Sequence, residues 1–297
     1  MSSGLEVLTA IGEQKPRNSR GILKAGLDLL GSFNLRRGLG DDIWEVRERV
    51  FLAALDEFDL DTAEKMLKEI EKKFPDSVRM NKLKGLLFEV QGNYKDARTL
   101  YGKLEKENEH DQGAVKRKVA ILKALGHTDK ALKELTSYLE VFQSDQEAWQ
   151  ELALLNVDLG NYAAATFCYE ELILHAPTNP FFHLICGESM YTQGGARNML
   201  DARKYISQSL VMRPAEKGNL RALFGLAVTT NTIQKNASSV ALAIADDEDP
   251  EEVESMNRKL NKWACDKLLE ISNNGKMCHD LSKMVKEVAG DLQVEKN

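Results

Sequence analysis

Histidine and cysteine side chains are scattered along this chain of 297 residues in no arrangement that suits catalysis or metal binding. Of the five histidines, four fall in or near the expected turns between helices, and no two are spaced as metal ligands on one helical face. Cys278 and His279 are neighbours, so on a helix their side chains point apart and form no catalytic pair. No glycine-rich loop ending in Lys-Ser or Lys-Thr is present to hold a phosphate. The sequence therefore predicts no catalytic residue, no metal ligand and no cofactor site, and thus a protein that is not an enzyme.

One group of basic side chains is a candidate binding site. It consists of Arg79, Lys82, Lys116 and Arg117. These residues fall on the first helices of two consecutive repeats, described below, and on the face expected to line a groove. Charges that simply face water are the ordinary explanation. The alternative is a partner-binding groove for an acidic or carboxylate-bearing segment, which clustered positive charge favours through complementarity.

A period of 34 residues indicates which elements position these side chains. The period is carried by small residues at Ala63, Ala97, Ala131 and Ala165, followed after 37 residues by Ala202. The same period of 34 separates Gly92, Gly126, Gly160 and Gly194. A small residue at one phase of such a period is typical of tetratricopeptide repeats, in which each repeat is a pair of antiparallel helices.

Each repeated residue type has a physical role in such a hairpin. Alanine allows the two helices to approach closely, and the large residue one turn later fills the space toward the next pair. These large residues are Leu67, Tyr101, Leu135, Tyr169 and Ile206. Glycine supplies the left-handed conformation that ends the first helix, and proline after the second helix stops it. We therefore expect an all-α, right-handed superhelix of hairpins, an α-solenoid, with the alanines buried at the crossings.

The period also predicts the organisation of the chain. We expect an N-terminal segment with one helix over 1–43 and a C-terminal region of capping helices, including an acidic linker, over 233–297. The repeats between them are predicted at about 44–77, 78–111, 112–145, 146–179 and 180–216, followed by a helix at 218–232. In the C-terminal region, Val253, Met256, Leu260, Trp263 and Ile271 are predicted to trace the apolar face of one helix, and Leu281, Met284, Val285, Val288 and Leu292 that of another.

Composition excludes several classes of function. The net charge of −6 argues against a general nucleic-acid-binding surface. Apolar runs of about six residues are far shorter than the ~20 residues needed to span a bilayer, and no secretory signal is visible. Four cysteines without close pairing favour a reducing compartment. These features predict a chain that is cytosolic or faces the cytosol.

Several stretches go beyond the general repeat pattern. They are Gly40–Trp44 (GDDIW), Val50–Asp56 (VFLAALD), Arg117–Ile121 (RKVAI), Asp145–Trp149 (DQEAW), Tyr191–Gly195 (YTQGG) and Arg221–Leu226 (RALFGL). Together and in this order, they resemble the family of subunit 2 of the endoplasmic reticulum membrane protein complex. The resemblance covers about residues 40–230.

This resemblance implies a non-enzymatic scaffold on the cytoplasmic face of the endoplasmic reticulum membrane. Its implied partners are the other subunits of that complex, namely cytosolic segments of membrane subunits and a soluble cytosolic subunit. Membrane association would then be peripheral and indirect, through these partners. The implied activity is support for the insertion of transmembrane segments, from tail-anchored and multipass clients, by the membrane subunits.

A cytosolic adaptor or co-chaperone that binds peptide tails in its groove is the alternative. Repeat proteins that grip chaperone tails resemble one another in carrying a lysine and, four residues later, an asparagine. The equivalent pairs here are Glu48/Leu52, Lys82/Leu86, Lys116/Ala120 and Gln150/Leu154. None contains the asparagine, which weakens the adaptor hypothesis.

Overall fold

The computed structural model describes residues 18–108, 111–243 and 249–273, and every regular element in these ranges is a helix. The chain divides into two compact units, Met1–Leu135 and Thr136–Asn297, and each is described by itself. The all-α tetratricopeptide fold predicted from the sequence is confirmed within them. The handedness of the superhelix stays a prediction.

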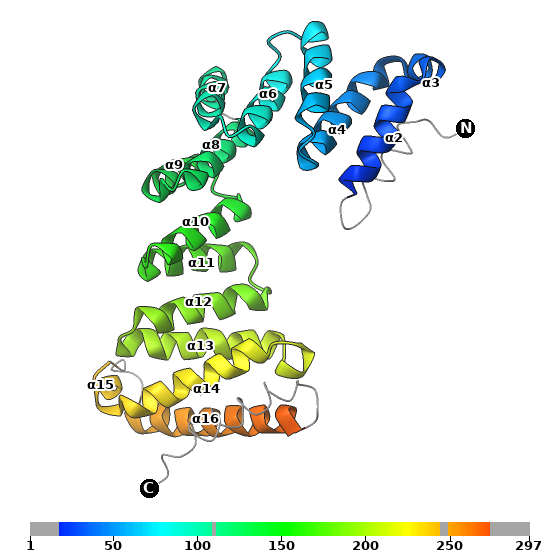
Figure 1. Cartoon of the computed structure of the whole chain (residues 1–297). Helices are drawn as coiled ribbons and strands as arrows, with labels where there is room; N and C mark the ends of the chain where they lie inside the picture. The colour runs from blue at the N-terminus through cyan, green and yellow to red at the C-terminus, as the bar shows by residue number, and fades with distance from the viewer. Residues whose placement is uncertain (1–17, 109–110, 244–248, 274–297) are drawn as a thin grey trace. The chain divides into compact units, whose positions relative to one another are not determined.

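The first unit begins with an N-terminal pair of helices and continues as helical hairpins (Figure 1). Its elements are α2 (Ser19–Gly31), α3 (Phe33–Gly38), the 3-10 turn η1 (Gly40–Asp42), α4 (Ile43–Asp56), α5 (Leu60–Lys73), α6 (Val78–Val90), α7 (Tyr94–Glu107), α8 (Gln112–Ala124) and the part of α9 (Thr128–Val141) up to Leu135. Helix α3 is an addition to the single helix expected here. Ser32 adopts an extended conformation that ends α2, and the same residue is the N-cap of α3.

The second unit contains the remainder of α9 and the helices that follow it. They are α10 (Gln146–Asp158), α11 (Tyr162–His175), α12 (Pro180–Gln193), α13 (Ala196–Met212), the 3-10 turn η2 (Ala215–Lys217), α14 (Leu220–Lys235), α15 (Ala237–Ala241) and α16 (Pro250–Asn273).

The turns inside the hairpins form at the glycines that recur every 34 residues. Gly92, Gly126 and Gly160 have φ values of 75°, 72° and 74°, in the left-handed region. In the first of these turns, the Gly92 amide donates to the Glu89 carbonyl and the Asn93 amide donates to the Phe88 carbonyl. These two bonds satisfy the last carbonyls of α6 and form a Schellman motif. The prediction that glycine ends the first helix is confirmed for these repeats.

The repeated alanines lie buried at the helix crossings, as predicted. All five alanines from Ala63 to Ala202 have no exposed surface. The large residues one turn later are also buried, with Tyr101, Leu135 and Ile206 at 1% exposure or less. Alanine at one position and a bulky side chain one turn along therefore form the repeated packing unit of both compact units.

Helix α16 covers the end of the array by packing on α14 (Figure 1). Its buried face differs from the predicted one, because Met256 and Trp263 are 50% and 46% exposed. Asn257 and Asn261 face α14 instead, where their side-chain amides donate to the carbonyl oxygens of Thr230 and Ala227. The buried face combines these hydrogen-bonded asparagines with apolar residues, namely Ala264, Cys265, Leu268 and Ile271. Ile271 of the predicted face is therefore buried, whereas Met256 and Trp263 are turned outward. The predicted stripe from Leu281 to Leu292, and residues 246–248 of the acidic run, lie outside the described residues.

Candidate partner-binding surfaces

The first helices of the repeats carry the predicted basic residues, and in the first unit most of these have carboxylate partners. Arg79 on α6 pairs with Glu48 on α4, with 2.7 Å between Nε and Oε2. Arg117 on α8 pairs with Glu89 on α6 at 3.5 Å. Both arginine side chains remain at least half exposed. The pairs therefore join consecutive first helices and neutralise part of the charge assigned to partner binding.

Lys82 has a more buried partner. Its Nζ lies 2.8 Å from Oδ2 of Asp111, whose side chain is only 5% exposed. Asp111 also caps α8, because its Oδ1 accepts a hydrogen bond from the Ala114 amide. Lys82 therefore compensates a carboxylate that is held almost entirely out of water. Lys116, the fourth predicted residue, is partly buried on α8.

Replacing Lys82 with methionine is expected to destabilise the protein by roughly 1–3 kcal/mol, since the Asp111 carboxylate would lose its counter-charge in a buried position. Replacing the exposed Arg79 with methionine should cost no more than about 1 kcal/mol, as is usual for surface ion pairs. Urea unfolding of the two variants measures the difference. Equal losses would show that burial of Asp111 does not matter.

A second network is fully internal to the first unit. Nζ of Lys118 on α8 lies 2.6 Å from Oε2 of Glu105 on α7 and 3.0 Å from Oε2 of Glu134 on α9. Burial opposes the ammonium charge, but the hydrogen bonds to both glutamates outweigh it and raise the pKa of Lys118. Sequence reasoning missed this network, although one of its pairs repeats. Lys84 and Glu71, each 34 residues before Lys118 and Glu105, form the equivalent ion pair at 3.3 Å.

The second unit has an apolar groove on its first helices. It has a volume of about 480 Å³ and lies between α10, α11 and α12, with Arg221 of α14 at its edge. Leu154 and Phe181, which are 59% and 53% exposed, line it together with Val157 and Ile185. Arg221 on α14 donates to both oxygens of Glu188 on α12 at its polar side. Exposed leucine and phenylalanine on adjacent first helices indicate a surface that a partner could cover.

The sequence contains a signal for this groove. Leu154 lies on the groove side of its helix, at the position where a chaperone clamp would have asparagine. Phe181 directly follows Pro180 at the start of α12, where it remains on the surface. Apolar residues on the open face of two neighbouring first helices would have identified the groove.

Chemically reactive groups in the described ranges are not assembled into a site. Cys168 and Cys186 are buried, and this burial raises the pKa of each thiol to about 12, so neither is a thiolate at neutral pH. Within the described residues, no three His, Cys, Asp or Glu side chains are grouped to hold a metal ion. Across those same ranges, none of the helices combines the length and apolar character that crossing a membrane requires.

Comparison with known proteins gives sequence relatives with a shared name. Residues 66–211 match the family described as the EMC2 TPR-like repeat domain. ER membrane protein complex subunit 2-A of Xenopus laevis is 42% identical over 229 residues, covering 77% of this chain and 75% of that protein. ER membrane protein complex subunit 2 of Dictyostelium discoideum is 27% identical over 276 residues, covering 90% of this chain and 81% of that protein.

A solved structure adds information on the fold alone. The C-terminal part of a TPR repeat-containing protein from Cytophaga hutchinsonii aligns with a TM-score of 0.55, at 12% sequence identity. The alignment covers 84% of this chain and 97% of that one. At this identity the likeness concerns the stacking of helical hairpins, and it carries no information about partners.

Proposed function

This chain belongs to the family of ER membrane protein complex subunit 2, and from that premise we propose that it is a non-catalytic scaffold subunit of that complex. It organises the cytosolic part of the complex by holding cytosolic segments of membrane subunits and a soluble cytosolic subunit. Its contribution to the insertion of tail-anchored and multipass segments is indirect. It keeps the subunits that perform insertion assembled.

The observation that carries this proposal is the apolar groove between α10, α11 and α12. A scaffold needs a surface that favours association over exposure to water, and exposed Leu154 and Phe181 provide one. The ion pair between Arg221 and Glu188 lies beside it, so a bound segment would meet an apolar floor and a polar edge. This combination is typical of protein interfaces, which have an apolar centre and a polar rim.

The four basic residues of the first unit remain a proposed second contact for an acidic segment. Because Arg79, Lys82 and Arg117 already have internal carboxylate partners, such a segment would compete with Glu48, Asp111 and Glu89. The net binding energy is therefore the difference between the new contact with the segment and the internal ion pair that it replaces. We accordingly assign the larger share of partner binding to the apolar groove.

The proposed location is the cytoplasmic face of the endoplasmic reticulum membrane, with peripheral attachment through the partner subunits. The names of the relatives support the membrane assignment. Association through partners requires no spanning segment in this chain.

The alternative function, a co-chaperone that grips peptide carboxylates, gains no support from the side chains. At the clamp position of the second repeat, Lys82 is held by Asp111 at 2.8 Å. At the fourth repeat the corresponding pair is Gln150 and Leu154, which line an apolar groove. Neither arrangement presents a free lysine beside an asparagine.

Substituting Leu154 and Phe181 with serine is expected to reduce recovery of partner subunits when the chain is captured from detergent-solubilised membranes. The reason is the loss of apolar contact area in the groove. Helicity should be unchanged, because both side chains are largely exposed in the free protein.

A matched control replaces two exposed leucines outside the groove, Leu174 and Leu242, with serine. Full recovery with this control and poor recovery with the groove variant would support the assignment. Full recovery with both would exclude the groove as the surface that binds the partners.

A further inference from the structure

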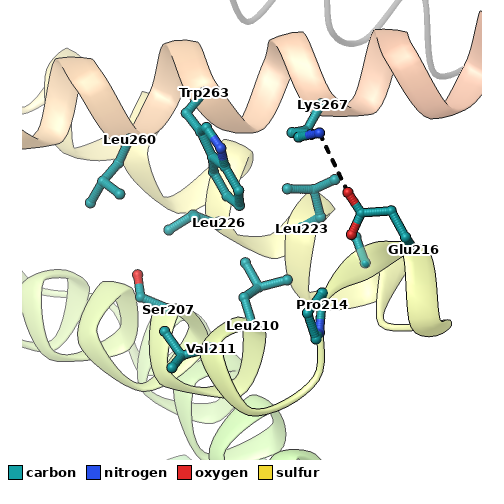
Figure 2. Close-up of a pocket in the computed structure, with 11 residues that line it drawn as sticks. Ser207, Leu210, Val211, Pro214, Glu216, Leu223, Leu226, Leu260, Trp263 and Lys267 are labelled. Carbon is teal, nitrogen blue, oxygen red and sulfur yellow. Dashed lines mark ion pairs between the residues drawn. The ribbon is translucent and has the colours of Figure 1, made fainter.

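A second apolar groove lies in the second unit, away from the proposed partner-binding groove. It has a volume of about 510 Å³ and is formed by α13, α14 and α16. Figure 2 shows Leu260 and Trp263 of α16 opposite Leu210 and Val211 of α13, with α14 between them. Its rim has one ion pair, between Lys267 and Glu216 at 3.4 Å.

The groove exists because of how α16 is turned. The amide side chains of Asn257 and Asn261 bind α14, so the edge of α16 that carries Leu260 and Trp263 is directed over the groove. Trp263 is 46% exposed and Val211, on the opposite wall, is 76% exposed. If a further apolar segment covered these side chains, their apolar surface would be removed from water, which is favourable.

One polar atom in this groove is also unsatisfied. The Oγ atom of Ser207 is buried and has no hydrogen-bond partner among the described residues. Ser207 lines the groove beside Leu210 (Figure 2). Since buried hydroxyls in folded proteins nearly always have a partner, this atom points to an occupant with a polar group as well as apolar ones.

We propose that the chain's own C-terminal segment, residues 281–292, binds in this groove as an amphipathic helix. Leu281, Met284, Val285, Val288 and Leu292 share one face at helical spacing. A helix of this segment is roughly 18 Å long. Its apolar face would cover the exposed apolar surface of Trp263, Val211 and Leu260.

The position of the segment in the chain makes this contact accessible. Helix α16 ends at Asn273, and Trp263 lies roughly 15 Å back along it. Residues 274–280 can extend over roughly 20 Å, so the segment can turn and run back beside α16. A short tether of this kind gives an effective concentration on the order of millimolar, so even a weak intrinsic affinity fills the groove. This inference is independent of the proposed function.

Trp263 provides a direct probe of occupancy. The chain has three tryptophans, and replacing Trp44 and Trp149 with phenylalanine leaves Trp263 as the one emitter. The full chain, purified without other subunits, is compared with a chain that ends at Asn274. We expect truncation to shift the Trp263 emission to longer wavelength and to increase its quenching by acrylamide. A synthetic peptide of residues 275–297 should reverse both changes.

Two variants of the full chain keep the test valid if the truncated chain folds poorly. Val285→Asp places a charge on the apolar face of the segment and should reproduce the effect of truncation. Lys283→Asp introduces the same side chain on the opposite face and should leave Trp263 protected. If Trp263 is quenched equally in the full chain, the Val285→Asp variant and the truncated chain, the segment does not occupy the groove and the inference is wrong.

Discussion

Replacing Gly187 with alanine is expected to destabilise the protein, whereas the same replacement at Gly225 is expected to stabilise it. A methyl group on Gly187 of α12 would lie 2.6 Å from Cγ1 of Ile206 and 3.0 Å from the carbonyl oxygen of Ala202. At Gly225 of α14 the nearest atom, again on Ile206, is 3.6 Å away, which is an ordinary contact. Both glycines lie within helices, where alanine is intrinsically favoured by about 1 kcal/mol.

The two changes differ in packing alone. At Gly225 the helical preference is gained without a clash, so we expect stabilisation of up to about 1 kcal/mol. At Gly187 the backbone of α13 cannot move aside cheaply, and overpacking of about 1–3 kcal/mol should exceed the gain. Urea unfolding of both variants is the measurement. Stabilisation by Gly187→Ala would show that α12 and α13 are farther apart than described.

Replacing Lys118 with methionine is expected to cost about 1–3 kcal/mol of stability. The change leaves Glu105 and Glu134 near each other without their shared cation. Removing one partner of a buried ion network is usually more damaging than replacing the whole network. We take a value below the range for fully buried pairs, because both glutamate side chains are about one-third exposed.

The control is a triple variant in which Glu105 and Glu134 are also replaced by glutamine. It should recover much of the lost stability, since no uncompensated charge remains. A triple variant as unstable as Lys118→Met would show that the loss comes from packing of the lysine side chain.

The same network predicts a dependence on alkaline pH. The pKa of Lys118 is raised in the folded protein, so its contribution to stability is complete below the ordinary lysine value of about 10.4. It is lost as pH rises through the higher folded pKa. The stability difference between the unmodified protein and Lys118→Met should therefore shrink at the alkaline end of a pH series.

The helical repeats could be predicted from sequence because their determinants are local or periodic. Alanine at each crossing and glycine at the hairpin turns act through size and backbone conformation, and both properties belong to the residue itself. Helix α16 differed because its orientation depends on where Asn257 finds a carbonyl acceptor on α14. A stripe of apolar residues such as Met256 and Trp263 cannot reveal that the buried face also includes hydrogen-bonded asparagines.

The candidate sites depended still more on contacts between distant residues. The repeat pattern predicts Arg79 and Lys82 as groove residues, but their carboxylate partners lie about thirty positions away, on α4 and at the N-cap of α8. Whether a lysine is available to a partner is decided by those neighbours and not by its own position in the repeat. The apolar groove around Leu154 likewise appears only when residues of α10, α11 and α12 come together.

Capture of the unmodified chain tests most directly whether it works as a subunit of the ER membrane protein complex. The chain is expressed with an affinity tag in cells, endoplasmic reticulum membranes are solubilised in mild detergent, and the captured proteins are quantified. We expect other subunits of the complex to be recovered in amounts comparable to the chain itself. Recovery of heat-shock chaperones without these subunits, or of the chain alone, would contradict this assignment.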